Sequence, residues 1–194
     1  METARRVGIR WTIGDVSRNG FEALRLSIWG AWKLFGPEAA YGVCVNTVSV
    51  DEARAQTGTV PEAVRWHAVS YEDVPPELGA HLTWEMAEGT AWKLVPLRLF
   101  PDRYELALDN DCILWGVPAA LRTWLADDAS PSCVLAEDVR PCANRFSDLA
   151  GDEPRNAGIR GLPPGSDFED ALREILSRLC TLSCRKLSPG WRYF

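Results

Sequence analysis

The chain has 194 residues, of which 46% are hydrophobic and 25% charged, and its formal net charge is −6. This length and composition are those of a globular domain with its own hydrophobic core, so we do not expect a disordered chain. The acidic balance argues against a general nucleic-acid-binding protein, because such proteins carry a surplus of Lys and Arg.

The amino-terminal sequence is polar, and no apolar segment of membrane-spanning length follows it. We therefore expect neither a signal peptide nor a transmembrane helix. The six cysteines show no Cys-x-x-Cys spacing, and we interpret them as reduced thiols of a cytoplasmic protein. The two histidines are too few for a histidine-based metal site.

The first part of the chain alternates strand and helix patterns. β-Branched and alternating runs predict strands, and apolar residues at helical spacing predict helices, the longest of which is ended by Gly36 and Pro37. The predicted elements are, in order, a strand over 7–13, a helix over 21–35, a strand over 41–45, a short helix over 50–56 and a strand over 63–69.

The second part continues in the same way. The predicted elements are a buried strand over 106–108 that resumes over 112–115, a helix over 119–125, a strand over 132–136, a loop over 140–158, a short apolar piece over 159–162 and a helix that Ser166 or Asp167 caps. Strands that alternate with helices predict an α/β fold with a mainly parallel central sheet and helices on both faces.

Polar residues follow three of the predicted strands directly. Asp15 follows the first strand, Asn46 the second, and Asp109 to Asp111 follow the buried strand that ends at Leu108. In open parallel sheets ligands bind beyond the carboxyl ends of the strands. We therefore expect these residues to gather around one ligand.

The sequence Asp109-Asn110-Asp111 interrupts an apolar run. Burying two carboxylates without a cation is costly, and hard divalent cations prefer carboxylate oxygens. If the step is extended, Asp109 and Asp111 point to the same side and reach one ion that carries a phosphate. The alternative is an ordinary turn, for which Asp and Asn are also suitable.

Other polar residues are weaker candidates. Lys93 and Arg98 precede the Asp-x-Asp segment and could offset the charge of a diphosphate, or be solvated loop residues. Glu137 and Asp138 follow an apolar strand and could orient or deprotonate an acceptor hydroxyl, or begin an acidic loop. The sequence contains no phosphate-binding Gly-rich loop, dinucleotide fingerprint or nucleophile elbow.

On these residues the chain resembles a GT-A type glycosyltransferase. The similarity rests on four segments that together span most of residues 7–165. They are the first strand, loop and helix from Thr12 to Phe35, the strand end Cys44-Val45-Asn46, the segment Leu108-Asp-Asn-Asp-Cys-Ile-Leu, and Arg155-Asn156-Ala-Gly-Ile-Arg-Gly-Leu-Pro163.

The resemblance implies transfer of a sugar from a nucleotide-diphosphate sugar to an unknown acceptor, which could be a saccharide, a lipid or a protein. It implies that Asp109 and Asp111 hold Mn²⁺ or Mg²⁺ and that Glu137 or Asp138 lies near the acceptor. The residues it implies for donor binding are Thr12, Asp15, Asn46, Lys93, Arg98, Asn110 and Asn156.

The resemblance also implies a single GT-A-like domain over residues 1–178, followed by an atypical tail over 179–194. No histidine follows His81, whereas many metal-dependent members have a late histidine ligand. The tail does not continue the family's pattern, and we expect a truncated or frame-shifted end.

Two alternatives stay open. One is a non-catalytic remnant of the fold that binds a nucleotide at most. The other is an Asp-x-Asp phosphohydrolase of the haloacid-dehalogenase type, in which the first aspartate is a nucleophile. That motif normally lies on the first strand and is followed by Thr or Val, whereas here it lies in mid-chain and Cys112 follows it.

Overall fold

The structure is a computed structural model that describes residues 6–79, 92, 95, 97–126, 132–139 and 153–186. The chain divides into two compact units. The sheet unit comprises Met1–Ser70 and Arg98–Ser166, and the second unit comprises Tyr71–Leu97 and Asp167–Phe194. The single domain expected over 1–178 stays a prediction.

The sheet unit contains a six-stranded sheet in the order β3-β2-β1-β4-β6-β5. Its elements are β1 (Val7–Ile13), α2 (Arg18–Phe35), β2 (Ala40–Val45), α3 (Val50–Thr57), β3 (Val64–Ala68), β4 (Tyr104–Leu108), α7 (Ala119–Ala126), β5 (Val134–Glu137) and β6 (Arg155–Leu162). Strands β1 to β4 pair in parallel, and β6 is antiparallel to both β4 and β5. The predicted α/β fold with a mainly parallel sheet is confirmed.

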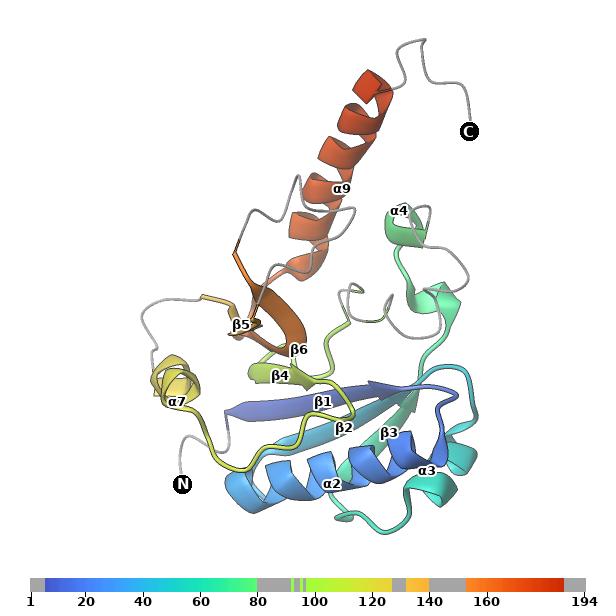
Figure 1. Cartoon of the computed structure of the whole chain (residues 1–194), viewed down its shortest axis with the longest axis vertical. Coiled ribbons are helices and arrows are strands. Elements are labelled where there is room, and N and C mark those ends of the chain that lie inside the picture. Colours follow the sequence, from blue (N-terminus) through green and yellow to red (C-terminus); the bar gives the residue numbers. More distant parts are fainter. Residues whose placement is uncertain are drawn as a thin grey trace. The chain divides into compact units, whose positions relative to one another are not determined.

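Helices α2 and α7 cover one face of this sheet, which we call the helix face (Figure 1). Trp11 of β1 is fully buried there and donates to the hydroxyl of Ser27 in α2, with 2.9 Å between Nε1 and Oγ. The ring of Trp124 in α7 meets Tyr104 of β4 edge-on at a centroid distance of 4.9 Å. Helix α2 ends, as predicted, at Gly36, whose φ of 68° suits a residue without Cβ.

The opposite face of the sheet, which we call the second face, carries the segment that precedes β4. A Cβ added to Gly8 would lie 2.3 Å from the ring of Phe100, and one added to Gly42 would lie 2.4 Å from Leu99. Both strands therefore need glycine there, because only a bare backbone lets this segment lie against them.

The second unit contains the short 3-10 helix η1 (Tyr71–Asp73), α4 (Pro76–Gly79) and α9 (Phe168–Lys186). Asp167 caps α9, since its Oδ1 accepts from the backbone N–H groups of Glu169 and Asp170 at 2.9 and 3.2 Å. This confirms one of the two predicted caps. Helix α9 continues past residue 178, where we placed the start of the tail. None of the helices in the described ranges is both long and apolar enough to span a membrane.

Two local predictions were wrong. Residues 112–115 do not resume a strand. This segment instead runs alongside α2: Ser27 Oγ donates to the Cys112 carbonyl, and Gly30 lies beside the Leu114 carbonyl. Residues 155–158 are not loop, because β6 already begins at Arg155.

Candidate functional site

The carboxyl ends of β1 and β2 are joined by polar contacts. The backbone N–H of Asn46 donates to the Ile13 carbonyl at 3.0 Å, and that of Asp15 donates to Thr47 Oγ1 at 2.5 Å. A Cβ on Gly14 would lie 2.1 Å from Asn46 Oδ1, so glycine is needed for this approach. The predicted neighbours Asp15 and Asn46 thus lie together, with Thr47 as a partner that the sequence analysis missed.

The Asp-x-Asp segment forms a turn at the end of β4. The Cys112 N–H donates to the Asp109 carbonyl at 3.0 Å, and the side-chain amide of Asn110 donates to the carbonyl of Gly20 in α2 at 3.3 Å. The segment is therefore a turn and not an extended step, so strand alternation does not place the two carboxylates on one side, and the predicted metal site stays a prediction. Asp109 is half-buried and Asp111 is exposed.

Asp109 lies against the first half of β6. Its N–H donates to the Gly158 carbonyl at 2.9 Å, and a Cβ on Gly158 would lie 3.2 Å from Asp109 Oδ2. Asn156 Oδ1 accepts from the Gly158 N–H at 2.7 Å, and Asn156 Nδ2 donates to Asp138 Oδ2 at 3.1 Å. Polar groups therefore run without a break from β4 to the end of β5.

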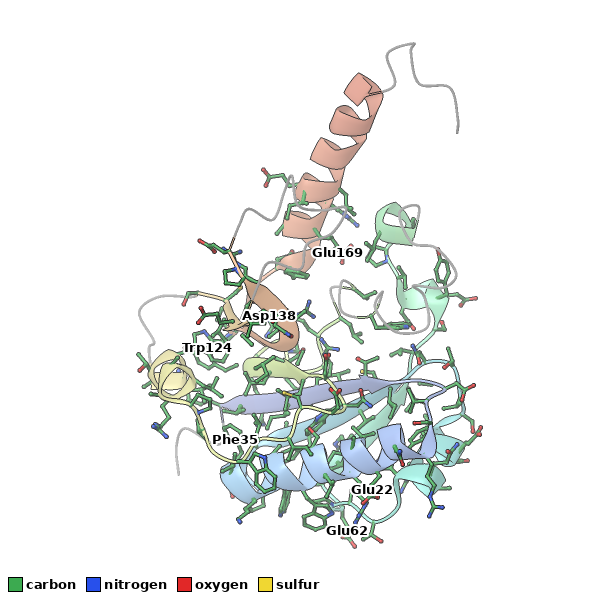
Figure 2. All side chains as sticks on the ribbon, in the orientation of Figure 1. Glu22, Phe35, Glu62, Trp124, Asp138 and Glu169 are labelled. Carbon is green, nitrogen blue, oxygen red and sulfur yellow. The ribbon has the colours of Figure 1, made fainter. Side chains whose placement is uncertain are left out.

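Asp138 is oriented by three contacts at the end of β5. Besides the amide of Asn156, its Oδ1 accepts from the Val139 N–H at 2.7 Å, and its own N–H donates to the Pro154 carbonyl at 3.0 Å. Figure 2 labels Asp138 on the part of the sheet where β5 and β6 pair. Glu137 is exposed and pairs in register with Arg155.

A groove of about 510 Å³ is lined by residues of β5 and of the segment that begins β6. Its lining includes Glu137, Leu135 and Cys133 of the strand region, together with Pro154 and Arg155. The groove therefore ends beside the residues that we predicted to lie near an acceptor.

One of the predicted donor-binding residues, Arg98, does not join this edge. Arg98 lies at the opposite edge, where Nη1 donates to the Pro163 carbonyl after β6 at 3.0 Å and Nη2 to the Arg103 carbonyl before β4 at 3.1 Å. The Arg98 guanidinium therefore joins the segment after β6 to the segment before β4. Lys93 lies outside the described residues.

Buried charges on the second face were missed by the sequence analysis. Arg10 Nε and Glu105 Oε1 are 3.1 Å apart, and the two side chains are 2% and 1% exposed. Arg10 Nη1 donates to Thr12 Oγ1 at 3.1 Å, so the Thr12 hydroxyl faces along the sheet instead of beyond its edge. The polar alternation of Arg10 and Thr12 in an apolar strand was the available signal.

The charges at this edge shift two pKa values. Burial raises the pKa of the Cys112 thiol, and the neighbouring carboxylates of Asp109 and Asp111 raise it further. Burial, together with the charge of Arg10, lowers the pKa of Arg160 to about 10 against the opposing influence of nearby anions.

The chemistry of the residues present fits a hard divalent cation in part. No group of three metal-binding side chains occurs among the residues that the structure describes. Asp109 and Asp111 are nevertheless carboxylates of one turn, and Mg²⁺ commonly takes only one or two protein carboxylates when a phosphate completes its coordination. The pair suits a cation that arrives with a diphosphate better than a cation held by protein alone.

No protein-family model and no curated protein sequence matches the chain. The fold is similar to that of the galactosyltransferase LgtC in complex with donor and acceptor sugar analogs, with 15% identity and a TM-score of 0.50 over 96% of this chain. It is also similar to an active-site mutant of LgtC, with 15% identity and a TM-score of 0.52 over 96% of this chain. The chain spans 66% of the length of both LgtC structures.

A third similar structure is mouse xyloside xylosyltransferase 1 in its apo form. The identity is 11% and the TM-score 0.53, over 95% of this chain and 73% of that one. At such low identities the likeness establishes the fold alone. The chain therefore has the GT-A glycosyltransferase fold.

Proposed function

We propose that this chain is a metal-dependent glycosyltransferase that binds a nucleotide-diphosphate sugar and transfers the sugar to an acceptor. The observation that carries the proposal is the continuous line of polar groups from Asp109 through Gly158 and Asn156 to Asp138, at the ligand-binding edge of a GT-A fold. The LgtC structure with donor and acceptor sugar analogs supports the class of ligand.

Asp109 and Asp111 would hold Mn²⁺ or Mg²⁺. When bound, the cation supplies Lewis-acid stabilisation of the departing nucleoside diphosphate. Asp15 and Asn46, which lie at the neighbouring strand ends, would contact the nucleoside. The side-chain amide of Asn110 donates to the Gly20 carbonyl and so attaches the turn to α2.

Asp138 is the candidate to orient the acceptor hydroxyl and to accept its proton. Its carboxylate is held by Asn156 Nδ2 and the Val139 N–H, so its direction is fixed before an acceptor arrives. Glu137 is the second candidate and borders the groove along β5, where an acceptor would lie. The nature of that acceptor, a saccharide, a lipid or a protein, is left to experiment.

Calorimetric titration with UDP and GDP, each with and without Mn²⁺, tests the donor site. We expect Mn²⁺-dependent binding that Asp111→Ala and Asp109→Asn weaken by about tenfold or more, equivalent to roughly 1.4 kcal/mol. Asp102→Ala is the matched control, because Asp102 is an exposed aspartate in the turn before β4, at the other end of that strand. A folded protein that binds neither nucleotide in either condition contradicts the proposal.

A second candidate is nucleotide binding without transfer. It is favoured by the turn at Asp109 to Asp111, which does not line up the two carboxylates on one extended strand. Incubation with a panel of nucleotide sugars separates the two candidates. Release of free sugar or of a glycosylated acceptor indicates a transferase, whereas binding without turnover indicates the second candidate.

A further inference from the structure

Two adjoining grooves follow β3, the strand at one end of the sheet order. Their volumes are about 460 and 400 Å³. Because the same four residues line both grooves, we treat the two as one surface, which we call the β3 groove. The shared residues are Arg54 of α3, Glu62 of the loop before β3, and Val64 and Trp66 of β3. Figure 2 labels Glu62 on that loop.

Trp66 presents its indole on the helix face of the sheet. It is in register with Val43 of β2, which is in register with Trp11 of β1, and residues in register on parallel strands share a face. Trp11 is fully buried beneath α2, whereas Trp66 belongs to the last strand on this side and stays half-buried. The indole of Trp66 therefore packs against the core and still lines the groove.

Arg54 and Glu62 bring polar groups to the same groove. Both side chains are exposed. Within the part of the chain that the structure describes, neither forms an ion pair or a side-chain hydrogen bond. A guanidinium offers several hydrogen-bond donors and a carboxylate several acceptors. The β3 groove thus combines an aromatic surface with donors and acceptors that a ligand can use.

A second tryptophan borders the β3 groove. Trp29 of α2 is 40% exposed, and its Nε1 donates to the Thr59 carbonyl at 3.1 Å. Thr59 lines the groove together with Val60 and Pro61, so this hydrogen bond holds the indole of Trp29 beside it. An aromatic ring that is fixed before binding loses little conformational freedom when a ligand arrives.

We propose that the β3 groove, together with Trp29, is a binding site for a saccharide chain of β-linked pyranoses. Such sugars have a face of axial C–H groups that stacks on the electron-rich face of an indole, and hydroxyl groups around the ring that form hydrogen bonds. Trp66 and Trp29 offer the two indoles, and Arg54 and Glu62 offer the polar groups.

The alternative occupant is a peptide strand that adds to the edge of β3. It would use the backbone of β3 and pockets for alternate side chains. This mode gives no role to Trp29, which lies on α2 and is fixed to the loop before β3. The saccharide accounts for both tryptophans. The site is also independent of the proposed function, since it needs neither a nucleotide nor a metal.

Calorimetric titration with hexasaccharides, without nucleotide or Mn²⁺, tests the proposal. The probes are the β-linked cellohexaose, chitohexaose and xylohexaose, and the α-linked maltohexaose. We expect at least one β-linked probe to bind, and Trp66→Leu and Trp29→Leu each to weaken its binding roughly fivefold or more. Failure of all three β-linked probes to bind overturns the proposal, as does tighter binding of maltohexaose than of any of them.

Leucine keeps an apolar side chain at position 66 and removes only the aromatic surface. If Trp66→Leu does not fold, Trp29→Leu and Arg54→Ala decide, because Trp29 and Arg54 are exposed and their replacement leaves the core intact. We expect Arg54→Ala to weaken binding of the same probe severalfold. Unchanged binding in both of these variants would overturn the proposal.

Two control variants match these changes. Trp115 is 91% exposed and does not line the β3 groove, so Trp115→Leu should leave saccharide binding unchanged. Asp51 is an exposed carboxylate of α3 that does not line the groove, so Asp51→Asn is the control for Glu62→Gln, which should weaken binding. Equal losses in a control and its test variant would mean that binding is not specific and would overturn the assignment.

Fluorine NMR of the chain labelled with 5-fluorotryptophan locates the bound saccharide. The signals of Trp29 and Trp66, assigned from their leucine variants, should shift during the titration, whereas that of Trp115 should not. Shifts confined to other tryptophans would overturn the proposal. Sedimentation velocity covers the remaining occupant: a dimer that Trp66→Leu dissociates would assign the β3 groove to a second copy of the chain and overturn the saccharide site.

Discussion

Gly158 lies between two polar side chains of the candidate site, and there is little room for a Cβ atom at this position. An added methyl group would lie 2.9 Å from Asn156 Oδ1 and 3.2 Å from Asp109 Oδ2. Both neighbours are side-chain ends, so they can move, but only by leaving their present positions.

We therefore expect Gly158→Ala to change the free energy of unfolding by less than roughly 1 kcal/mol, yet to weaken Mn²⁺-dependent UDP binding severalfold. Urea unfolding and calorimetry measure the two effects. Gly116→Ala is the matched control, since nothing lies within 4 Å of a Cβ at Gly116. Unaltered nucleotide binding by Gly158→Ala would show that Asp109 and Asn156 need not keep their positions.

Cys112 reports the charge of the Asp-x-Asp turn. Burial raises the pKa of its thiol, and Asp109 and Asp111 raise it further because their negative charges disfavour a thiolate. Only the thiolate reacts with iodoacetamide. At a fixed pH near 8 we expect Asp111→Asn to speed alkylation of Cys112, because removal of the charge lowers the thiol pKa and increases the thiolate fraction.

Peptide mapping by mass spectrometry gives the rate at Cys112 separately from the other cysteines. Asp170→Asn is a control, since Asp170 belongs to the second unit and is not among the groups that shift the Cys112 pKa. Slower alkylation in Asp111→Asn would contradict the assigned sign.

At the scale of elements, Glu105 connects three parts of the sheet unit. It belongs to β4 and forms an ion pair with Arg10 of β1. Its carboxylate also accepts hydrogen bonds from the backbone N–H groups of Leu99 and Phe100 on the second face. Removing one partner of a buried pair leaves the other charge uncompensated. We expect Glu105→Gln to lower the free energy of unfolding by about 3–5 kcal/mol, as measured by urea denaturation.

Glu22→Gln is the corresponding change in an exposed pair, that of Glu22 with Arg25 within α2. It should have little effect, because water and salt screen exposed charges. Similar losses in the free energy of unfolding in the two variants would mean that the buried pair stabilises the fold no more than the exposed pair.

Regular elements with a clear period were predictable from the sequence. The apolar residues of β1 alternate along the strand, and those of α2 recur at helical spacing because α2 buries one apolar face. The run at residues 112–115 misled the prediction, since Ile113 lies beside Gly30 of α2 and Leu114 joins the core, whereas Trp115 is 91% exposed. A short apolar run does not reveal its partner. The first half of β6 gave no signal, because Arg155 and Asn156 are exposed and polar.

The location of the candidate site was predictable, but its contacts were not. Strand ends place Asp15, Asn46 and Asp109 at one edge of a parallel sheet. The meeting of Asn156 with Asp138 depends on a shift in register between β5 and β6 at Leu135 and Ala136, which no local pattern encodes. The buried pair of Arg10 and Glu105 likewise depends on the pairing of two strands that are far apart in the sequence.

For the whole molecule, the hydrophobic core lies within the sheet unit. The buried core cluster draws on β1, α2, β2, β4 and α7 and contains no residue of the second unit. We expect a chain that ends after Ser166 to keep a cooperative urea transition, with a smaller dependence on urea because less surface is exposed on unfolding.

A chain that ends after Ile159 is the comparison for this truncation. It lacks the last residues of β6, including the buried Leu162 that pairs with Glu105, and should lose the cooperative transition. If both shortened chains unfold without a cooperative transition, the sheet unit depends on the second unit for its stability.

The central position of β4 beside β1 has a consequence for the order of folding. The two strands are neighbours in the sheet, but Arg10 and Glu105 are separated by 95 positions in the chain. Local elements such as β1, α2 and β2 can associate early, whereas β4 must first close a long loop that includes residues of the second unit. During synthesis, Arg10 therefore has no carboxylate partner until Glu105 has left the ribosome, when most of the chain has been made. Completion of the candidate site is therefore a late event in folding.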